Sequence, residues 1–389
     1  MPATIVNEPH KYKYCGNPVR LTILGGHLTA FPPYTPTQPN LTCHVMVFDP
    51  SDLVNPVAAY QAPYDTKNGR TDFDLKNALA WDPKIPQYLW TNTSFNSGLA
   101  QGFSKPYVVS FADRFGIHPE TEALTTLATK WMLYGGYPVE FLTDNSVPFV
   151  AHNYNDKDLR KMVDRTQPDW VCVFHKTAVE FVNIEVVAYL SDGTTTTLNF
   201  GPVEAEAQKT YWYESGFKSL GLAALEVGDI CVLSYDYNLK LGASLFGTVK
   251  YIIDQAVHEW NTYFAFANGL GGFESFRMKG KVTIEPVAER EIIQTTREFG
   301  YQSNQGEFNE FNNYSQLSYE VNSGYLSAFD TAIFQALLLH KCWLLDMVNG
   351  VTIAIVRESK TFKLRNDDTD PEGHEFKFKI ANQSPWATT

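Results

Sequence analysis

The sequence has 389 residues, with 31 Lys and Arg against 43 Asp and Glu, and a formal net charge of −12. A chain of this length is expected to hold more than one hydrophobic core, and its acidic balance argues against nucleic acid as the main ligand, because phosphate binding depends on clustered Lys and Arg. Aromatic residues make up 14% of the chain and charged residues 19%, which favours broad β-sheets over solvated helices.

The five cysteines stand singly, with no CxxC pair, so the sequence carries neither a zinc-ribbon signal nor a disulfide framework. We expect small apolar core residues at all five positions: Cys15, Cys43, Cys172, Cys231 and Cys342. The opening MPATIVNEPHKYKY lacks the apolar stretch of a signal peptide, and nowhere do about 18 uncharged apolar residues run together. These features predict a protein made in the cytoplasm, without membrane insertion.

Residues 1–146 read as a first β-sandwich domain. Short apolar or alternating runs between Gly, Pro and Asn clusters predict antiparallel strands: Val19–Leu24, Leu41–Phe48, Val57–Gln61 and Pro106–Ala112. The proline-rich stretch Phe31–Asn40 predicts an exposed connection between two of them. In Glu122–Tyr134, apolar residues at helical offsets predict a helix, which the glycines Gly135 and Gly136 would end.

Residues 147–284 read as a second β-sandwich domain of related build. The clearest hairpin pattern is Val179–Phe200, where two β-rich runs flank the turn Ser191-Asp192-Gly193. Further strands are expected at Ile230–Leu241 and Gly247–Asp254, and Phe273–Lys281 is expected to close this second sheet.

Residues 285–389 read as a third, smaller α+β domain, because charged residues interleave with apolar ones from Glu285 onward. An amphipathic helix is expected at Ala328–His340. The expected strands are Arg290–Phe299, Tyr314–Asn322, Trp343–Met347, Val351–Glu358 and His374–Ala381. The predicted fold is therefore mainly β, with two consecutive antiparallel β-sandwich domains of immunoglobulin- or fibronectin-like type and then the α+β domain.

No pattern in the sequence predicts catalysis. Paired carboxylates could serve a hydrolase, but the acidic residues that flank an aromatic-rich segment lie in polar, loop-like sequence, where solvated turn carboxylates are the commoner case: Asp144, Asp156, Asp158 and Asp164. The motifs GxSxG and HExxH are both absent. We therefore assign no catalytic, cofactor-binding or metal-binding residue.

The acidic stretch DDTDPEGHE at Asp367–Glu375 begins like an EF-hand calcium loop. The twelfth position of that loop would be Lys379, where a bidentate Glu is needed, and Pro371 interrupts the pattern. An acidic hairpin tip is the favoured interpretation, and whether the tip holds an ion stays open at this point.

The stretch WNTYFAFANGLGGFESF, Trp260–Phe276, places six aromatic residues around the glycines Gly269, Gly271 and Gly272. It has none of the spacing of a phosphate-binding loop. Glycines permit a tight bend where another backbone comes close, so we predict an internal corner or a contact surface.

Three stretches resemble segments of virion structural proteins, of tail or baseplate type, that are encoded by phages and prophages of Bacteroidetes. They are YFAFANGLGGFESFRMKGK, the opening NEPHKYKYCGNPVRLTIL, and the closing portion from YEVNSGYLSAF through CWLLDMVNG to HEFKFKIANQ. The resemblance implies a sandwich-built assembly subunit with no catalytic residues to carry over.

The leading hypothesis is a non-enzymatic virion subunit, without cofactors, whose partners are other copies of itself and neighbouring virion proteins. The segments expected at contacts are Phe31–Asn40, Trp90–Phe103 and Tyr301–Tyr314. The alternative is a receptor- or glycan-binding surface module of the same kind of particle, in which aromatic side chains stack on a host glycan: Trp90, Trp212 or Tyr213.

Overall fold

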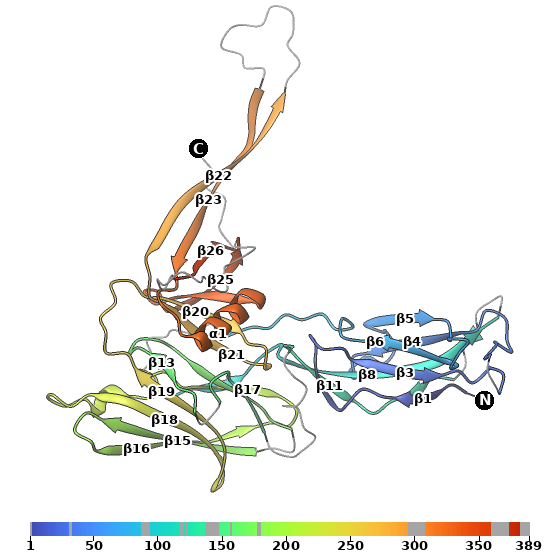
Figure 1. Cartoon of the computed structure of the whole chain (residues 1–389), viewed down its shortest axis with the longest axis horizontal. Coiled ribbons are helices and arrows are strands. Elements are labelled where there is room, and N and C mark those ends of the chain that lie inside the picture. Colours follow the sequence, from blue (N-terminus) through green and yellow to red (C-terminus); the bar gives the residue numbers. More distant parts are fainter. Residues whose placement is uncertain are drawn as a thin grey trace, which may run out of the picture. The chain divides into compact units, whose positions relative to one another are not determined.

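The computed structural model describes residues 2–30, 33–86, 94–116, 120–121, 123–136, 148–155, 158–176, 180–294, 308–358 and 373–381. The chain is mainly β, with several antiparallel sheets and one α-helix among these residues (Figure 1). Contacts divide it into two compact units. Unit 1 comprises Met1–Pro86, Asn92–Asp254 and Ala267–Glu274, and unit 2 comprises Gln87–Thr91, Gln255–Phe266 and Ser275–Thr389.

The first half of unit 1 contains two sheets that share one core. One sheet has the order β1 (Thr4–Asn7), β3 (Arg20–Leu24) and β6 (Arg70–Asp74), and the other the order β2 (Tyr12–Tyr14), β11 (Lys130–Leu133), β8 (Ser104–Phe115), β4 (Thr42–Phe48) and β5 (Ala58–Ala62), with β9 (Glu120–Thr121) and β10 (Thr125–Thr126) pairing with β8. Alternate residues point inward, so that Leu21 and Ile23 of β3 are buried together with Val45 and Val47 of β4. The sheets are sandwich-like, and the four strands predicted for this segment are present, to within a few residues at their ends.

The helix predicted over Glu122–Tyr134 is wrong. The segment instead forms β10 and β11, and β11 lies between β8 and β2, with Trp131 opposite both Pro106 and Tyr12. The helical spacing of its apolar residues was overridden by strand pairing on both sides, in a segment whose threonines favour extended backbone. Gly135 has a φ of +127° and follows the end of strand β11 instead of ending a helix, and its carbonyl accepts a hydrogen bond from the Gly16 N–H.

The second half of unit 1 again contains two sheets. Their orders are β12 (Phe149–Ala151), β14 (Trp170–Phe174), β17 (Thr210–Glu214), β7 (Ser97–Leu99), and β13 (Lys161–Val163), β19 (Ser244–Ile253), β18 (Val232–Leu241), β15 (Glu180–Leu190), β16 (Thr195–Ala205). A short 3₁₀ helix, Leu222–Leu225, precedes β18. The predicted hairpin is confirmed: β15 and β16 pair, Gly193 has a φ of +83°, and Asp192 accepts a hydrogen bond from the Thr194 N–H.

Unit 2 is built on one curled sheet and helix α1 (Ala328–Leu339). The strand order is β21 (Phe273–Met278), β20 (Thr262–Ala267), β24 (Cys342–Asp346), β25 (Val351–Arg357), β26 (Glu375–Ile380), β23 (Phe308–Asn322), β22 (Val282–Gln294). The sheet must curl strongly, because the Phe264 ring of β20 meets the rings of Phe376 and Phe378 of β26, at 5.2 and 5.3 Å between centroids, although two strands separate β20 from β26.

The predicted helix is confirmed. Ser327 caps α1 by accepting a hydrogen bond from the Asp330 N–H at 3.1 Å. Its residues Ile333, Phe334 and Leu337 are buried, and the Phe334 ring contacts Phe376 of β26. The helix therefore covers the aromatic interior of the curled sheet.

The sequence had suggested that Phe273–Lys281 closes the second sheet of unit 1, and this prediction is wrong. Its strand β21 forms the edge of the curled sheet, next to β20. All six residues of β21 are buried. The strand therefore has no exposed polar face, and its sequence does not indicate to which sheet it belongs. The strand β22 begins at Val282 and continues past Glu285, where the sequence becomes richer in charged residues and the third domain was predicted to begin.

Candidate functional site

The longest strands of the chain form a hairpin that extends past the rest of its sheet (Figure 1). β22 and β23 pair from Val282 opposite Val321 to Gln294 opposite Phe308. The next strand, β26, covers β23 only at Ser318–Asn322. Among the described strands, the remainder of β23 therefore pairs with β22 alone. A two-stranded ribbon is marginally stable in water without further cover.

The ribbon base carries apolar surface beyond the core. Ile284 is 54% exposed and Leu317 is 36% exposed. Ile284 lies opposite Tyr319, whose ring stacks on Phe378 at 5.2 Å. Leu317 is two residues from Tyr319 on the same strand and so shares its face. One face of the sheet is thus continuously apolar from the core to the exposed base of the ribbon, which we call the ribbon-base patch (Ile284 and Leu317).

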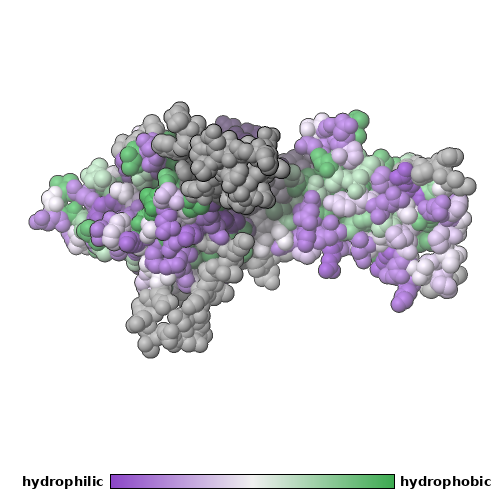
Figure 2. Space-filling view, turned by 90° about the horizontal axis from the view of Figure 1, so that it is seen from above, coloured by the Kyte–Doolittle hydropathy of each residue, from purple (hydrophilic) through white to green (hydrophobic). Residues whose placement is uncertain are grey.

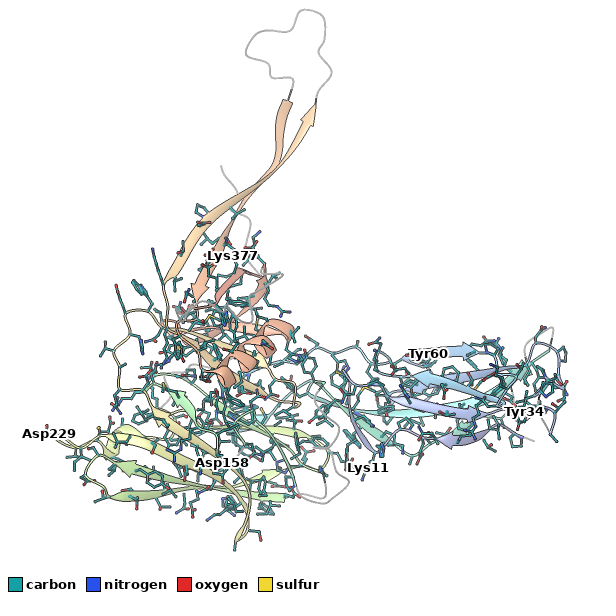
Figure 3. The ribbon with its side chains drawn as sticks, viewed as in Figure 1. Lys11, Tyr34, Tyr60, Asp158, Asp229 and Lys377 are labelled. Atoms are coloured by element: carbon teal, nitrogen blue, oxygen red, sulfur yellow. The ribbon has the colours of Figure 1, made fainter. Side chains whose placement is uncertain are left out.

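Charge separates the two faces and marks the ribbon as acidic. On the face opposite the patch, Lys377, labelled in Figure 3, forms an ion pair with Glu320 at 2.9 Å. The hairpin sequence from Val282 to Asn322 contains seven Glu, two Arg and neither Asp nor Lys. A basic partner surface would complement it.

Exposed apolar residues elsewhere are scattered. On the face shown in Figure 2, hydrophilic and hydrophobic residues are interspersed over the described parts. Val227, Val257 and Val348 are 69%, 98% and 90% exposed, but each belongs to a turn or connection. Single exposed apolar residues are ordinary in folded proteins, so they identify no binding surface by themselves.

A second feature, inside unit 1, was missed in the sequence: a cluster of four buried ionisable side chains. His152 follows β12, Lys161 begins β13, Asp169 directly precedes β14, and Glu274 belongs to β21. The side chains of His152, Asp169 and Glu274 are 0% exposed and that of Lys161 is 4% exposed. We call these four residues the buried cluster.

The two carboxylates converge on the lysine and the histidine. Lys161 Nζ lies 2.9 Å from Asp169 Oδ1 and 3.6 Å from Glu274 Oε2. His152 Nε2 lies 3.6 Å from both Asp169 Oδ2 and Glu274 Oε2. Because His152 Nδ1 accepts a hydrogen bond from the Tyr154 N–H, a neutral ring carries its proton on Nε2.

The surroundings of the buried cluster are aromatic and fully enclosed. The Tyr251 hydroxyl donates to Asp169 Oδ2 at 3.0 Å and lies 2.8 Å from Ser215 Oγ. The ring of Tyr251 stacks on that of Tyr235 at 4.6 Å, and burial raises the pKa of both phenols well above their usual value. The hydroxyls therefore stay protonated and act as donors.

Glu274 lies within the aromatic and glycine-rich stretch Trp260–Phe276, for which the sequence left two roles open, an internal corner or a contact surface. Its Oε1 accepts hydrogen bonds from the side-chain amides of Asn153 and Asn268. Every residue from Tyr263 to Met278 is buried, and a Cβ on Gly272 would lie 2.5 Å from that of Cys172. The stretch is an internal corner that delivers Glu274 into unit 1.

Other residues weighed in the sequence do not converge. Asp164 accepts from the N–H groups of Thr166 and Gln167, as a turn carboxylate does, and Asp158 is exposed. Asp144 and Asp156 lie outside the described residues, as does all of Asp367–Glu375 before Gly373. Within the described ranges, no three His, Cys, Asp or Glu side chains are placed to hold a metal ion.

The two candidate glycan-stacking residues that the structure describes, Trp212 and Tyr213, do not form an exposed platform. Trp212 is 7% exposed and Tyr213 is 0% exposed, while Trp90 lies outside the described residues. The Tyr213 hydroxyl instead lies 3.1 Å from His175 Nε2, and His175 Nδ1 lies 2.7 Å from Glu180 Oε2. These aromatic residues belong to the interior.

Acid is expected to destabilise unit 1 through His175. Burial lowers the pKa of His175, although Glu180 opposes this effect. Because the unfolded chain then binds the proton more readily, the stabilisation is present above the ordinary histidine pKa and is lost as the pH falls below about 6.5. Urea denaturation between pH 7.5 and 5 measures this slope, and it should be shallower in His175→Gln. An unchanged slope in the variant would contradict the assignment.

The described parts of the three expected contact segments differ in exposure and in secondary structure. The part of Phe31–Asn40 that is described, from Pro33 onward, is largely exposed, as predicted. In Trp90–Phe103, β7 pairs with β17; of its described residues Phe103 is fully buried, whereas Leu99 is 41% exposed. Of Tyr301–Tyr314, the described part from Phe308 onward lies in β23.

No protein-family model matches the chain, and no curated protein matches it. No helix among the described residues is both long and apolar enough to cross a membrane.

Proposed function

We propose that the chain is a non-enzymatic structural subunit of a phage virion or phage-like contractile particle, a tail or baseplate component that acts by protein–protein assembly. The observation that carries this proposal is the β22–β23 ribbon, which exposes the ribbon-base patch and strand edges that no other described strand pairs with. Such features are a hazard in a monomer and become binding surface once a neighbour covers them.

The sandwich-like halves of unit 1 fit the same role, and we assign both to the immunoglobulin- or fibronectin-like class. Stacked antiparallel sheets place their loops at the ends of the domain and keep a rigid core between them. The acidic ribbon of unit 2 can bind other copies of the chain or neighbouring virion proteins by strand addition and apolar contact.

Charging the ribbon-base patch is expected to abolish assembly without unfolding the chain. In the double variant Ile284→Lys and Leu317→Lys, both substituted side chains are partly exposed already, so stability should change by less than about 1 kcal/mol. Size-exclusion chromatography with light scattering, on the chain alone and with its neighbouring virion proteins, measures the assembled mass.

The matched control is Val348→Lys, which charges an apolar side chain that is 90% exposed and lies in the turn between β24 and β25. We expect the control to assemble like the wild type and the double variant to remain a monomer. Equal assembly of all three chains would overturn the role given to the ribbon.

A further inference from the structure

The buried cluster holds an amine against a carboxyl group in a site closed to water. Lys161 Nζ and Asp169 Oδ1 are 2.9 Å apart, and Cγ of Asp169, the atom that an amine would attack, is bonded to that oxygen. The two residues belong to segments of different sheets, since β13 lies in the five-stranded sheet and β14, which follows Asp169, in the four-stranded one. A bond between them would join the two sheets of this half of unit 1.

Burying an ion pair costs desolvation free energy, and in this cluster a proton transfer can neutralise the pair. Lys161 with Asp169 and Glu274 places one positive and two negative charges in a dry interior, where desolvation opposes each of them. Passing a proton from Lys161 Nζ to Asp169 Oδ1 along their hydrogen bond removes two of the three charges. It also produces an unprotonated amine, which is a nucleophile, facing a neutral carboxylic acid.

We propose that Lys161 and Asp169 condense into an isopeptide bond, a side-chain amide formed by the folded chain itself, with Glu274 as the group that carries the proton. The assignment rests on the convergence of amine, carboxyl and second carboxylate, and on the two donors that face Asp169 Oδ2: the Tyr251 hydroxyl at 3.0 Å and His152 Nε2 at 3.6 Å.

The reaction balances without any cofactor. The Nζ lone pair attacks Cγ of Asp169, and the negative charge that develops on Oδ2 is stabilised by the hydrogen bond from the Tyr251 hydroxyl, with His152 Nε2 3.6 Å away. Glu274 Oε2 takes one proton from the nitrogen and passes it to the Oδ1 hydroxyl. The C–Oδ1 bond breaks, water leaves, and a C–N amide bond remains, with Glu274 returned to its starting state. One amine and one carboxylic acid have become one amide and one water.

The mass of the denatured full-length protein tests this directly. We expect it to be lower than the sequence mass by one water molecule. Trypsin should leave the peptides Lys161–Arg165 and Thr166–Lys176 joined, because Lys161 and Asp169 lie on opposite sides of the cleavage after Arg165. A full sequence mass with two separate peptides would overturn the proposal, as would a lost water whose peptides are not joined.

Variants assign the roles. Lys161→Arg should show the full sequence mass, and Glu274→Gln should too, while the exposed control Glu285→Gln should stay linked. A linked Glu274→Gln chain would overturn the role of Glu274. Where a variant fails to fold, the mass and the peptides of the wild-type protein still decide whether the bond exists.

Discussion

Gly135→Ala is expected to lower the free energy of unfolding of unit 1 by about 4 kcal/mol, among the largest effects of any single substitution in this chain. A Cβ at this position would overlap the carbonyl oxygen of Gly269. The backbone cannot simply move away, because the Gly136 N–H donates to that same oxygen at 3.1 Å. Gly135 also has a φ of +127°, which L-residues rarely adopt. Urea denaturation followed by tryptophan fluorescence measures the loss.

Gly193→Ala is the matched control, since it separates the steric effect from the dihedral effect. Gly193 also has a positive φ, of +83°, but no atom lies within 4 Å of the added Cβ. We expect a loss of about 1 kcal/mol, the cost of the left-handed region alone. Equal losses in the two variants would contradict the steric role assigned to the Gly269 carbonyl.

Asn268→Ala is expected to cost about 4 kcal/mol, because the fully buried side chain makes four hydrogen bonds of roughly 1 kcal/mol each. Its Oδ1 accepts from the N–H groups of Leu270 and Gly272, at 3.1 and 3.0 Å. Its Nδ2 donates to Ala151 O at 2.9 Å and to Glu274 Oε1 at 3.2 Å. The substitution would remove the hydrogen bonds that hold the corner and one of the two side-chain amide donors to Glu274.

The control for Asn268→Ala is Asn199→Ala, on the exposed side of β16. We expect this variant to change stability by less than about 0.5 kcal/mol, as surface substitutions usually do. A small effect at Asn268 would mean that water replaces its bonds, and that the corner is less tightly held than its hydrogen bonds indicate.

Local sequence patterns predicted much of the β structure. The hairpin β15–β16 was recognisable because its strands are rich in β-branched residues and its turn contains Asp192-Gly193. Helix α1 was recognisable from its apolar spacing. The strand β11 was mistaken for a helix because its backbone partners, β2 and β8, are remote in sequence, and a short window cannot contain them.

The buried cluster could not be predicted for a related reason. His152, Lys161, Asp169 and Glu274 span more than a hundred residues and form no motif. The one local signal is Glu274 itself, a charged residue inside the otherwise uncharged run GLGGFESF. A charge in such a run predicts a buried partner, but only the fold shows that the partner is Lys161.

The assembly proposal and the isopeptide proposal are independent but compatible. A subunit that bears load in a particle gains from a covalent link between its sheets, since unfolding must then break an amide bond or leave the linked segment intact. The two proposals are tested by different substitutions, because Ile284 and Leu317 are not members of the buried cluster.

The proposed function requires that this chain is a permanent part of a particle. Mass spectrometry of purified particles from the producing bacterium, with immunogold labelling in the electron microscope, measures this most directly. We predict that the protein co-purifies in a fixed copy number and that gold marks the tail or baseplate. A protein that stays in the unassembled fraction, with no label on any particle, would contradict the account.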